Sequence, residues 1–534
     1  MPHRPPGVRP KRLGPIRSAP TLLWILPCLA ALVLCLPLFY LGIRASEARG
    51  PALLGLALRP RNAELLANTV LLALVAVALS SAVALPLAWI TERTDIPLRP
   101  CIVLLAVLPL TVPGYVMAYA LLSVGGDYGL AARLFGLPIP RPSGLWGSGI
   151  ALSLYTFPYL YLNLRTALSS MDRGLEEAAA SFGYARGAVF LRVILPQLGP
   201  AFFSGAAVVA LYAVGDFGVV ALMRYPTFSF AVYTQYAAAF DRVYAAALSL
   251  ALVALATALL ISEARLLRRT ISRPRSGQRG RARAYPLGAW KYPALLFVGL
   301  AVLAAVGFPL GTLAYWTLQA GRAEPLGSAA ASFGRSLMAA VPAAAVAAAT
   351  ALPTVYLADR YPSRLSAGLE RTAALGYGIP PIALALGLVF FSLRGAPALY
   401  QSFGLLVAAY GIHFQALALG PIRSALAHAP RRIEEAARSL GYSGLQAVLF
   451  ALVPALSRGI ASSFVIVFVM AMKELPLTLL LAPTGYTTLA AAVFSRTNEG
   501  QYAEAAPFAA GIVLCAGLGA ALVIRLEGRR HAPA

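Results

Sequence analysis

The chain has 534 residues, of which 59% are hydrophobic and 12% are charged, and its mean hydropathy is +0.74. This composition is too apolar for a soluble protein of that length, so it excludes an ordinary soluble enzyme or binding module. The formal net charge of +24 could suggest a nucleic-acid partner. The basic residues are concentrated beside apolar runs, however, which is typical of a membrane protein.

Twelve apolar runs are each long enough, at roughly 20 residues, to cross a bilayer as a helix. In the first half of the chain they are predicted near 21–43, 66–91, 101–123, 147–167, 198–222 and 243–263. In the second half they are predicted near 291–315, 333–357, 372–392, 402–420, 459–481 and 503–525. The first run follows basic residues, as a signal peptide does, but it is longer than an ordinary signal-peptide core and favours a membrane helix. The sequence therefore predicts an all-α polytopic membrane protein.

Three basic segments set the expected orientation: the first 20 residues, the joint between the sixth and seventh helices, and the end of the chain. With twelve crossings, all three lie on the same side of the membrane. The positive-inside rule assigns that side to the cytoplasm. We therefore expect a multi-pass protein of the cell inner (plasma) membrane with both termini in the cytoplasm, in contact with the lipid bilayer and without a nucleic-acid partner.

The sequence repeats itself at a period of about 260 residues. The Ala-Leu-Pro segment 84–86 reappears at 351–353, a displacement of 267, and Pro113 maps to Pro380 at the same displacement. Further on, the displacement falls to 258, which predicts a shorter outward loop in the second half. Each half then carries six helices in the same order, so the halves are parallel and related by a pseudo-two-fold axis along the membrane normal. The predicted organisation is a basic cytoplasmic segment (1–20), a first transmembrane half (21–263) with a loop at 171–197, a basic cytoplasmic linker (264–290), a second transmembrane half (291–525) with a loop at 429–455, and a cytoplasmic tail (526–534).

The two loops match residue by residue and lie between the fourth and fifth helices of their halves, on the predicted cytoplasmic side. Each has helix-forming residues with glutamate near the start, a glycine that can end the helix, and a proline 13 residues after that glycine. We expect a short surface helix with a sharp turn, suited to docking into a groove of a soluble partner. An ordinary amphipathic connector would explain one such segment; two copies at matched spacing favour a functional role.

These loops resemble the EAA loop of binding-protein-dependent ABC permeases, whose pattern is Glu-Ala-Ala, three residues, Gly, nine residues, an aliphatic residue, one residue, and Leu-Pro. The first copy matches this pattern at Glu177, Ala178, Ala179, Gly183, Val193, Leu195 and Pro196. The second copy departs from it with Ala451 for the aliphatic residue and Val453 for the leucine. The resemblance implies that the loops are coupling helices seated on two copies of a cytoplasmic ABC ATPase subunit. The coupling residues that it implies are Glu176, Glu177, Ala178, Ala179, Gly183, Glu434, Glu435, Ala436, Ala437 and Gly441.

The resemblance further implies an importer whose substrate is delivered from outside by a soluble binding protein. The chain shows no glycine-rich phosphate loop ending in Lys-Ser or Lys-Thr. We therefore expect no enzymatic activity and no cofactor bound by this chain, with ATP and Mg used by the partner ATPase. A secondary transporter would explain twelve helices, but it would not explain two matched EAA loops.

Charged residues at membrane depth cost about 2.5 to 3.5 kcal/mol each on insertion scales and need a reason. Asp216 lies late in the fifth helix, and Lys473 and Glu474 lie late in the eleventh. The displacement of 258 maps Asp216 onto Glu474, so the two carboxylates are expected to face each other in the outer path or gate. Carboxylates flanked by Tyr212 and Tyr225 would suit a hard cation that prefers oxygen ligands. An alternative is a structural ion pair between Lys473 and either carboxylate; no metal ligand is assigned.

The segments around these charges resemble fused iron(III) permeases. Residues 216–218, 222–228 and 231–236 resemble their first half, and 473–481 with 503–506 resemble their second half. The resemblance implies import of ferric iron handed over by a periplasmic or surface-tethered iron-binding protein. Thiamine permeases also carry a Gly-Asp-Phe-Gly segment, but in their second half, whereas here it lies in the first. Thiamine, polyamine and sulfate stay open as alternative substrates.

Overall fold

The computed structural model describes residues 20–47, 55, 59–171, 174–270, 285–320 and 326–528, and its regular elements there are helices apart from one β-bridge. The first half contains α1 (Leu22–Ser46), α3 (Pro60–Arg93), α4 (Arg99–Val107), α5 (Gly114–Leu122), α6 (Leu130–Phe135), α7 (Gly144–Ser170), α8 (Gly174–Ser181), α9 (Arg186–Val189), α10 (Leu195–Gly215), α11 (Gly218–Leu222), α12 (Phe228–Ala237) and α13 (Arg242–Thr270). The second half contains α14 (Lys291–Val302), α15 (Phe308–Ala320), α16 (Leu326–Arg360), α17 (Arg364–Leu375), α18 (Pro381–Gly395), α19 (Phe403–His413), α20 (Gln415–His428), α21 (Arg432–Ser439), α22 (Gly444–Gln446), α23 (Val453–Ala455), α24 (Ser457–Met472), α25 (Pro476–Leu481), α26 (Leu489–Asn498) and α27 (Tyr502–Gly528).

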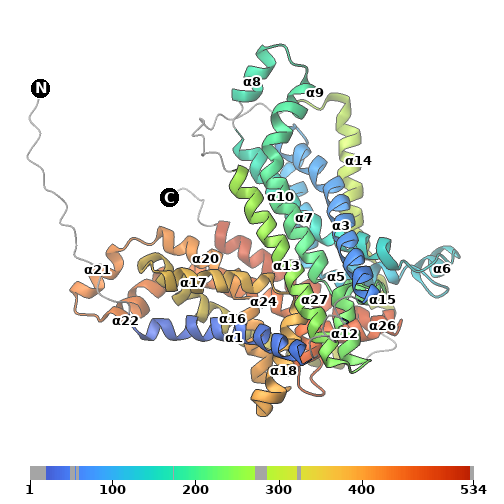
Figure 1. Ribbon diagram of the computed structural model, residues 1–534. Helices are drawn as coiled ribbons and strands as arrows, with labels where there is room; N and C mark the ends of the chain where they lie inside the picture. The colour runs from blue at the N-terminus through green and yellow to red at the C-terminus, as the bar shows by residue number, and fades with distance from the viewer. Residues whose placement is uncertain are drawn as a thin grey trace, which may run out of the picture.

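The helices form two arms that diverge from a common meeting point (Figure 1). The first arm is built on α3, α7, α10 and α13, and the second on α16, α17, α20 and α24, with each set packed side by side. The short helix α8 lies at the free end of the first arm, and α21 lies at the free end of the second. The two loops that match in sequence therefore occupy corresponding places in the fold.

Seven helices of the described residues are long and apolar enough to cross a membrane, and the number rises to eleven if each of four bent helix pairs is one span. The twelfth predicted segment, 147–167, lies in α7, which has 27 residues but falls outside that set. Many side chains of α7 are buried, because it packs between α3 and α10. All twelve predicted segments thus fall on helices, and the prediction of an all-α polytopic membrane protein is confirmed.

Two of the predicted spans are bent by 90° or more. The helical segment that ends at Thr111 meets α5 at 90°, and the one that ends at Gly378 meets α18 at 109°. Pro113 and Pro380, which the repeat maps onto each other, stand at these bends. Proline cannot donate the helical hydrogen bond and clashes with the preceding turn, so each bend has a local cause.

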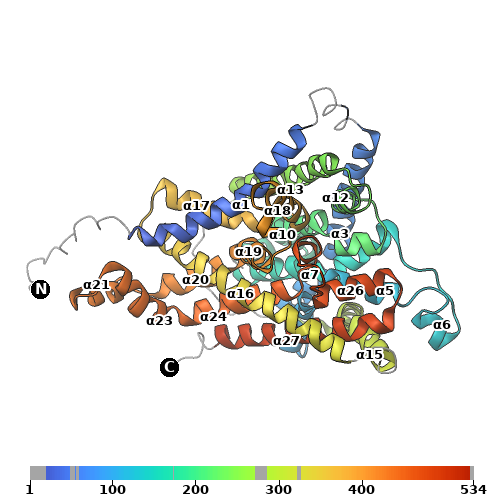
Figure 2. The same ribbon diagram turned by 90° about the horizontal axis from the view of Figure 1, so that it is seen from below.

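The first helix of each half packs against the opposite half. Helix α1 lies along α16, α17 and α18 of the second half, as Figure 2 shows for α17 and α18. The α14 and α15 segment contacts α3, α4 and α5 of the first half. At Gly387 of α18, a Cβ atom would stand 2.6 Å from the Pro37 carbonyl oxygen of α1, so this close approach requires glycine. The exchange ties the two halves together.

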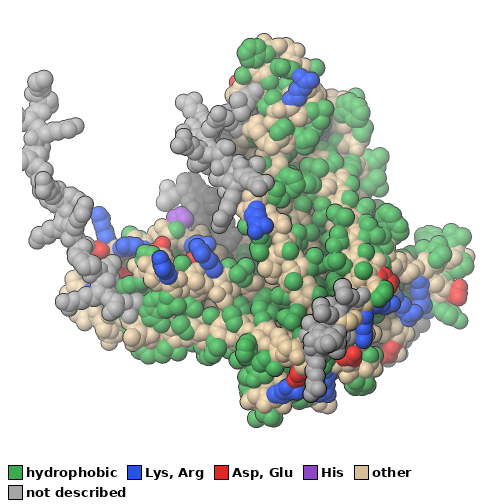
Figure 3. Space-filling view, viewed as in Figure 1, with side chains coloured by type: hydrophobic (Ala, Val, Ile, Leu, Met, Phe, Trp, Pro, Cys, Tyr) green, Lys and Arg blue, Asp and Glu red, His purple; other side chains and the backbone are tan. Residues whose placement is uncertain are grey.

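Apolar side chains cover the long sides of both arms, whereas Lys and Arg side chains gather in a few places, including the surface around α6 (Figure 3). Large hydrophobic side chains are exposed on several helices, among them Phe39 of α1, Leu74 of α3 and Leu518 of α27. Soluble monomers rarely expose large contiguous apolar surfaces. This is the surface expected of helices that face lipid.

Candidate functional site: a central cavity and two surface helices

The predicted helices 198–222 and 459–481 both break where their charged residues lie. In the first, α10 ends at Gly215 and α11 begins at Gly218. In the second, α24 ends at Met472 and α25 begins at Pro476. The expectation of continuous helices through these positions is therefore wrong, and the two breaks occur at positions that the repeat relates.

At each break a carboxylate accepts a hydrogen bond from the backbone of the short helix that follows. The Val219 amide donates to Asp216 Oδ1 at 2.7 Å, and the Leu477 amide donates to Glu474 Oε1 at 3.2 Å. Each carboxylate therefore satisfies a free amide at the start of the short helix that follows it. Val219 and Leu477 are separated by the same 258 residues as the two carboxylates, so the same local structure occurs once in each half.

A cavity of about 250 Å³ lies where the two arms meet, and both halves contribute to its wall. Several pairs of lining positions are related by the sequence repeat. These pairs are Leu110 and Tyr377, Pro113 and Pro380, Tyr155 and His413, Tyr212 and Met470, and Asp216 and Glu474. The two halves therefore contribute corresponding positions to this cavity.

Four of the five residues predicted for the path line the cavity: Tyr212, Asp216, Lys473 and Glu474. Tyr225 does not belong to this wall. It follows α11, and its hydroxyl donates to Asn68 Oδ1 of α3 at 3.2 Å. The structure thus brings both carboxylates and one of the two predicted tyrosines to one space.

The Lys473 ammonium donates to the Leu110 carbonyl oxygen of the opposite half at 3.1 Å. Among the ion pairs of the described residues, none joins Lys473 to Asp216 or Glu474. The structural ion pair considered from the sequence is therefore not formed. Lys473 instead bridges the two halves through a backbone carbonyl.

A row of tyrosines lies in the cavity wall, and of its members only Tyr212 was predicted from the sequence. The hydroxyls of Tyr159 and Tyr212 are 2.6 Å apart, and those of Tyr212 and Tyr377 are also 2.6 Å apart. The Tyr155 hydroxyl donates to Asp216 Oδ2 at 3.1 Å. Tyr155 and Tyr159 are four residues apart on α7, so they share a helix face, and this spacing could have identified them. No local signal in the sequence marks Tyr377.

His413, the position that the repeat matches to Tyr155, also lines the cavity, and its ring lies beside that of Tyr377. It is 1% exposed, and within the described residues its Nδ1 has no hydrogen-bond partner. In the part of the chain that the structure describes, no group of three or more His, Cys, Asp and Glu side chains is arranged to hold a metal ion. The cavity therefore offers phenol and carboxylate oxygens from both halves without a closed set of such ligands.

Buried ion pairs hold the two surface helices to their arms. Glu176 of α8 lies 2.9 Å from Arg93 at the end of α3, and Glu434 of α21 lies 3.0 Å from Arg360 at the end of α16. The glutamates are only 5% and 7% exposed. The repeat relates both partners, so the same charge pair anchors each helix. Both glutamates are among the predicted coupling residues, and their side chains face the arm.

The next residues of each helix form an outward surface. Glu177 and Glu435 are exposed, as are Ala178 and Ala436, while Ala437 is buried against the second arm. Two large apolar side chains beyond the helices are also exposed at matched positions, Phe182 (82%) and Leu440 (79%). These two residues were not predicted, although an apolar side chain directly before the turn glycine of a surface helix is a signal that the sequence offers.

The turn after each helix depends on glycine. Gly183 has φ +80° and Gly441 has φ +93°, in the left-handed region that glycine alone enters without a steric cost. The Tyr184 amide then reaches back to the Ala179 carbonyl oxygen at 3.2 Å, and the Tyr442 amide to that of Ala437 at 3.2 Å. These bonds close the helix ends as in a Schellman motif. The predicted sharp turn is present in both copies.

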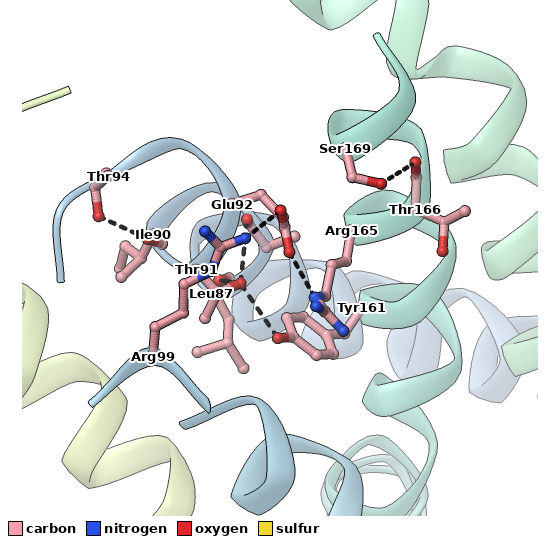
Figure 4. A network of polar contacts seen from close by, with 11 residues as sticks. Leu87, Ile90, Thr91, Glu92, Thr94, Arg99, Tyr161, Arg165, Thr166 and Ser169 are labelled. Carbon is pink, nitrogen blue, oxygen red and sulfur yellow. Dashed lines mark hydrogen bonds and ion pairs between the residues drawn. The ribbon is translucent and has the colours of Figure 1, made fainter. Parts of the chain in front are cut away.

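A polar network fixes the end of α3 that carries Arg93 (Figure 4). Glu92 lies between Arg165 of α7, at 2.6 Å, and Arg99 of α4, with which it also forms an ion pair. At the preceding residue of α3, the hydroxyls of Thr91 and Tyr161 of α7 are 3.2 Å apart. Because α3, α4 and α7 are joined here, the anchor of α8 rests on three helices.

Two repeated halves around a shared cavity, with a matched helix at the free end of each arm, define a two-half membrane transport component. The chain belongs to the family of binding-protein-dependent transport system inner membrane components, because the family model matches it twice, at residues 75–272 and 340–526. The two matches contain α8 and α21, respectively.

Curated relatives include both full-length and partial matches. The chain is 31% identical over 509 residues to the Fe(3+)-transport system permease protein FbpB 2 of Haemophilus influenzae, covering 94% of this chain and 97% of that protein. It is 32% identical over 202 residues to a probable sulfate transport system permease protein of Nephroselmis olivacea, covering 38% of this chain and 71% of that protein. It is 32% identical over 158 residues to a probable molybdenum ABC transporter permease protein of Haloferax volcanii, covering 30% of this chain and 58% of that protein. The first of these relatives therefore matches both halves of the chain, over 94% of its length.

Proposed function

We propose that this chain is the permease subunit of an ATP-driven importer, with α8 and α21 seated on two copies of a cytoplasmic ABC ATPase. The observation that carries the proposal is the pair of matched helices at the free ends of the arms, each held by a buried ion pair and each followed by an exposed apolar side chain. Phe182 and Leu440 are suited to fill pockets on a soluble partner, because buried apolar anchors supply most of the affinity of such contacts.

The arms diverge toward the ends that carry α8 and α21 (Figure 1). In the proposed cycle, ATP-driven closure of the two ATPase subunits brings these ends together, rotates the halves, and opens the cavity outward to receive substrate. Release of hydrolysis products restores the present arrangement. Hydrolysis, with its ATP and Mg, belongs to the separate ATPase subunits, and this chain supplies the path.

The glycine turns provide a test of this coupling. The double variant Gly183→Val with Gly441→Val is expected to abolish co-purification of the ATPase, because a β-branched residue is strained in the left-handed region and the turn must rearrange. A Cβ at either position meets no atom within 4 Å, so the effect is confined to the backbone. Gly187→Val is the matched control, because Gly187 also has open space but lacks a positive φ. Full retention of the ATPase by the double variant would contradict the proposal.

We also propose that the substrate is ferric iron. The relationship to an Fe(3+)-transport permease over nearly the whole of both chains supports this, as does the chemistry of the cavity. Asp216, Glu474 and the tyrosine row offer oxygen atoms, which hard cations prefer to nitrogen or sulfur. A sulfate anion would meet two carboxylates instead, and the relatives named for sulfate and molybdenum match only about a third of the chain.

The proposed orientation follows from the basic segments: both termini and the linker lie in the cytoplasm of a cell whose inner membrane holds the protein. Iron then arrives on the opposite side, from a periplasmic or surface-tethered binding protein. The meeting point of the arms faces that protein, and the free ends face the ATPases.

Uptake by intact cells tests the substrate. Iron-starved cells that lack this gene are expected to lose accumulation of labelled ferric iron and to recover it when the gene is restored. Uptake of labelled thiamine and sulfate, measured in parallel, is expected to be unchanged. Loss of thiamine or sulfate uptake with normal iron uptake would agree with the proposed class of transporter and would contradict the proposal that its substrate is ferric iron.

A further inference from the structure

The end of the linker between the halves packs beside the ion pair of Arg93 and Glu176, which anchors α8 to the first arm. The Tyr285 amide donates to the Arg93 carbonyl oxygen at 2.8 Å, and the Asp95 amide donates to the Tyr285 carbonyl oxygen at 3.3 Å. The Leu287 amide donates to Asp95 Oδ1 at 2.8 Å. These bonds add a short extended segment of the linker to the chain that follows α3, where the β-bridge between Thr94 and Tyr285 lies.

This docking places the Tyr285 side chain in the anchor itself. Its ring stacks on Trp89 with 5.9 Å between centroids, and its hydroxyl donates to Glu176 Oε2 at 3.2 Å. The other oxygen of the carboxylate, Oε1, faces Arg93. Glu176 therefore receives one partner from its own half and one from the linker.

In the second half, both partners of the matching glutamate come from that half itself. There the Tyr356 hydroxyl donates to Glu434 Oε2 at 2.7 Å, while Arg360 Nε donates to Oε1 at 3.0 Å. Tyr356 belongs to α16 and is the position that the repeat matches to Trp89. An indole has no hydroxyl, and its single N–H is placed differently from a phenol oxygen. The first half thus has no phenol at the position of Tyr356, and Tyr285 of the linker supplies the hydroxyl instead.

We propose that the end of the linker at Tyr285 belongs to the first coupling site, which is the contact of α8 with its ATPase subunit. There Tyr285 is a positioning residue that orients Glu176 and, through it, α8. The second coupling helix is oriented from within its own half, so the two sites are held by different means. A buried carboxylate that loses a hydrogen-bond donor is strongly penalised, and this penalty is what makes the phenol effective. The proposal rests on the proposed docking of α8 onto an ATPase subunit.

The test uses the whole transporter, purified with its ATPase subunits, and measures ATPase activity stimulated by loaded binding protein. Tyr285→Phe keeps the ring on Trp89 and removes only the hydroxyl; Tyr356→Phe is the matched change in the second half. Each is expected to lower the stimulated rate about tenfold at unchanged protein level, the scale of one lost hydrogen bond to a charged group. The double variant Trp89→Tyr with Tyr285→Phe copies the second half's arrangement and is expected to restore the rate.

The restoration separates positioning from a general structural effect, because a second substitution in the same cluster would otherwise add damage. A normal rate for Tyr285→Phe, whether or not Tyr356→Phe is impaired, would overturn the proposal. An impaired Tyr285→Phe that Trp89→Tyr does not rescue would overturn the role of the hydroxyl. If the unaltered chain did not bind an ATPase subunit, the proposed coupling would fail first, and co-purification would reveal that failure separately.

Discussion

Replacing both cavity carboxylates, by Asp216→Asn together with Glu474→Gln, is expected to lower ferric iron transport by roughly a hundredfold or more. At an effective dielectric constant of about 20, unit charges about 4 Å apart attract by roughly 4 kcal/mol, and a trivalent cation would lose two such attractions. The amide oxygens can still accept the Val219 and Leu477 N–H bonds, so the helix caps and the fold should survive.

Asp241→Asn is the control for this prediction. Asp241 caps the start of α13 through the Tyr244 amide at 3.0 Å, but it lies outside the cavity wall. Its replacement by asparagine should leave iron uptake within about twofold of normal, since removal of a remote charge changes little. Normal iron transport by the double cavity variant, at normal protein level, would show that the carboxylates only cap helices.

Arg93→Ala is expected to destabilise the protein by about 3 to 5 kcal/mol, because it leaves the Glu176 carboxylate buried without its charged partner. The thermal midpoint of the purified protein measures this loss. Because Glu176 belongs to α8, the variant is also expected to lose its ATPase subunits at temperatures at which the fold survives.

Arg61→Ala provides the matched control for the loss of an arginine. Arg61 and Glu64 form an ion pair of 3.8 Å with side chains 62% and 52% exposed. A pair of this kind contributes less than about 1 kcal/mol, so its removal should barely move the midpoint. Equal midpoints for the two variants would mean that the buried pair does not hold α8 in place.

The membrane helices were predictable because the signal is local. Each span needs a run of apolar residues, and even α7, which is largely buried, carries one. The repeat was equally visible, because positions such as Pro113 and Pro380 keep their spacing through the chain. The turns at Gly183 and Gly441 follow from residue type, since a left-handed backbone favours glycine.

Features that depend on contacts between distant segments were not predictable. The helix breaks beside Asp216 and Glu474 have a different reason: each carboxylate accepts a backbone amide only three residues further on, and the surrounding apolar run gives no sign of this local structure. The inward placement of Glu176 depends on Arg93, which lies 83 residues earlier in the chain and meets it only in the folded protein. The role of Tyr285 requires the end of the linker to return to α3, and a single tyrosine in a basic linker gives no sign of this.

The two halves share a backbone plan but differ in side chains where they meet the substrate path. At matched positions the first half presents Tyr155 and Tyr212, and the second presents His413 and Met470. The tyrosine row therefore comes mainly from one half and reaches the other only through Tyr377. A cation crossing this cavity would meet an asymmetric surface in spite of the symmetric fold.

We expect this chain to conduct ferric iron under the control of ATP. The most direct measurement is uptake of radiolabelled ferric iron into proteoliposomes that contain this chain and its ATPase subunits, with the iron-loaded binding protein on the opposite side from ATP. We predict accumulation that requires both ATP and the binding protein and that sulfate does not reduce. Accumulation without ATP, or ATP-driven uptake of sulfate or thiamine in place of iron, would contradict the claim.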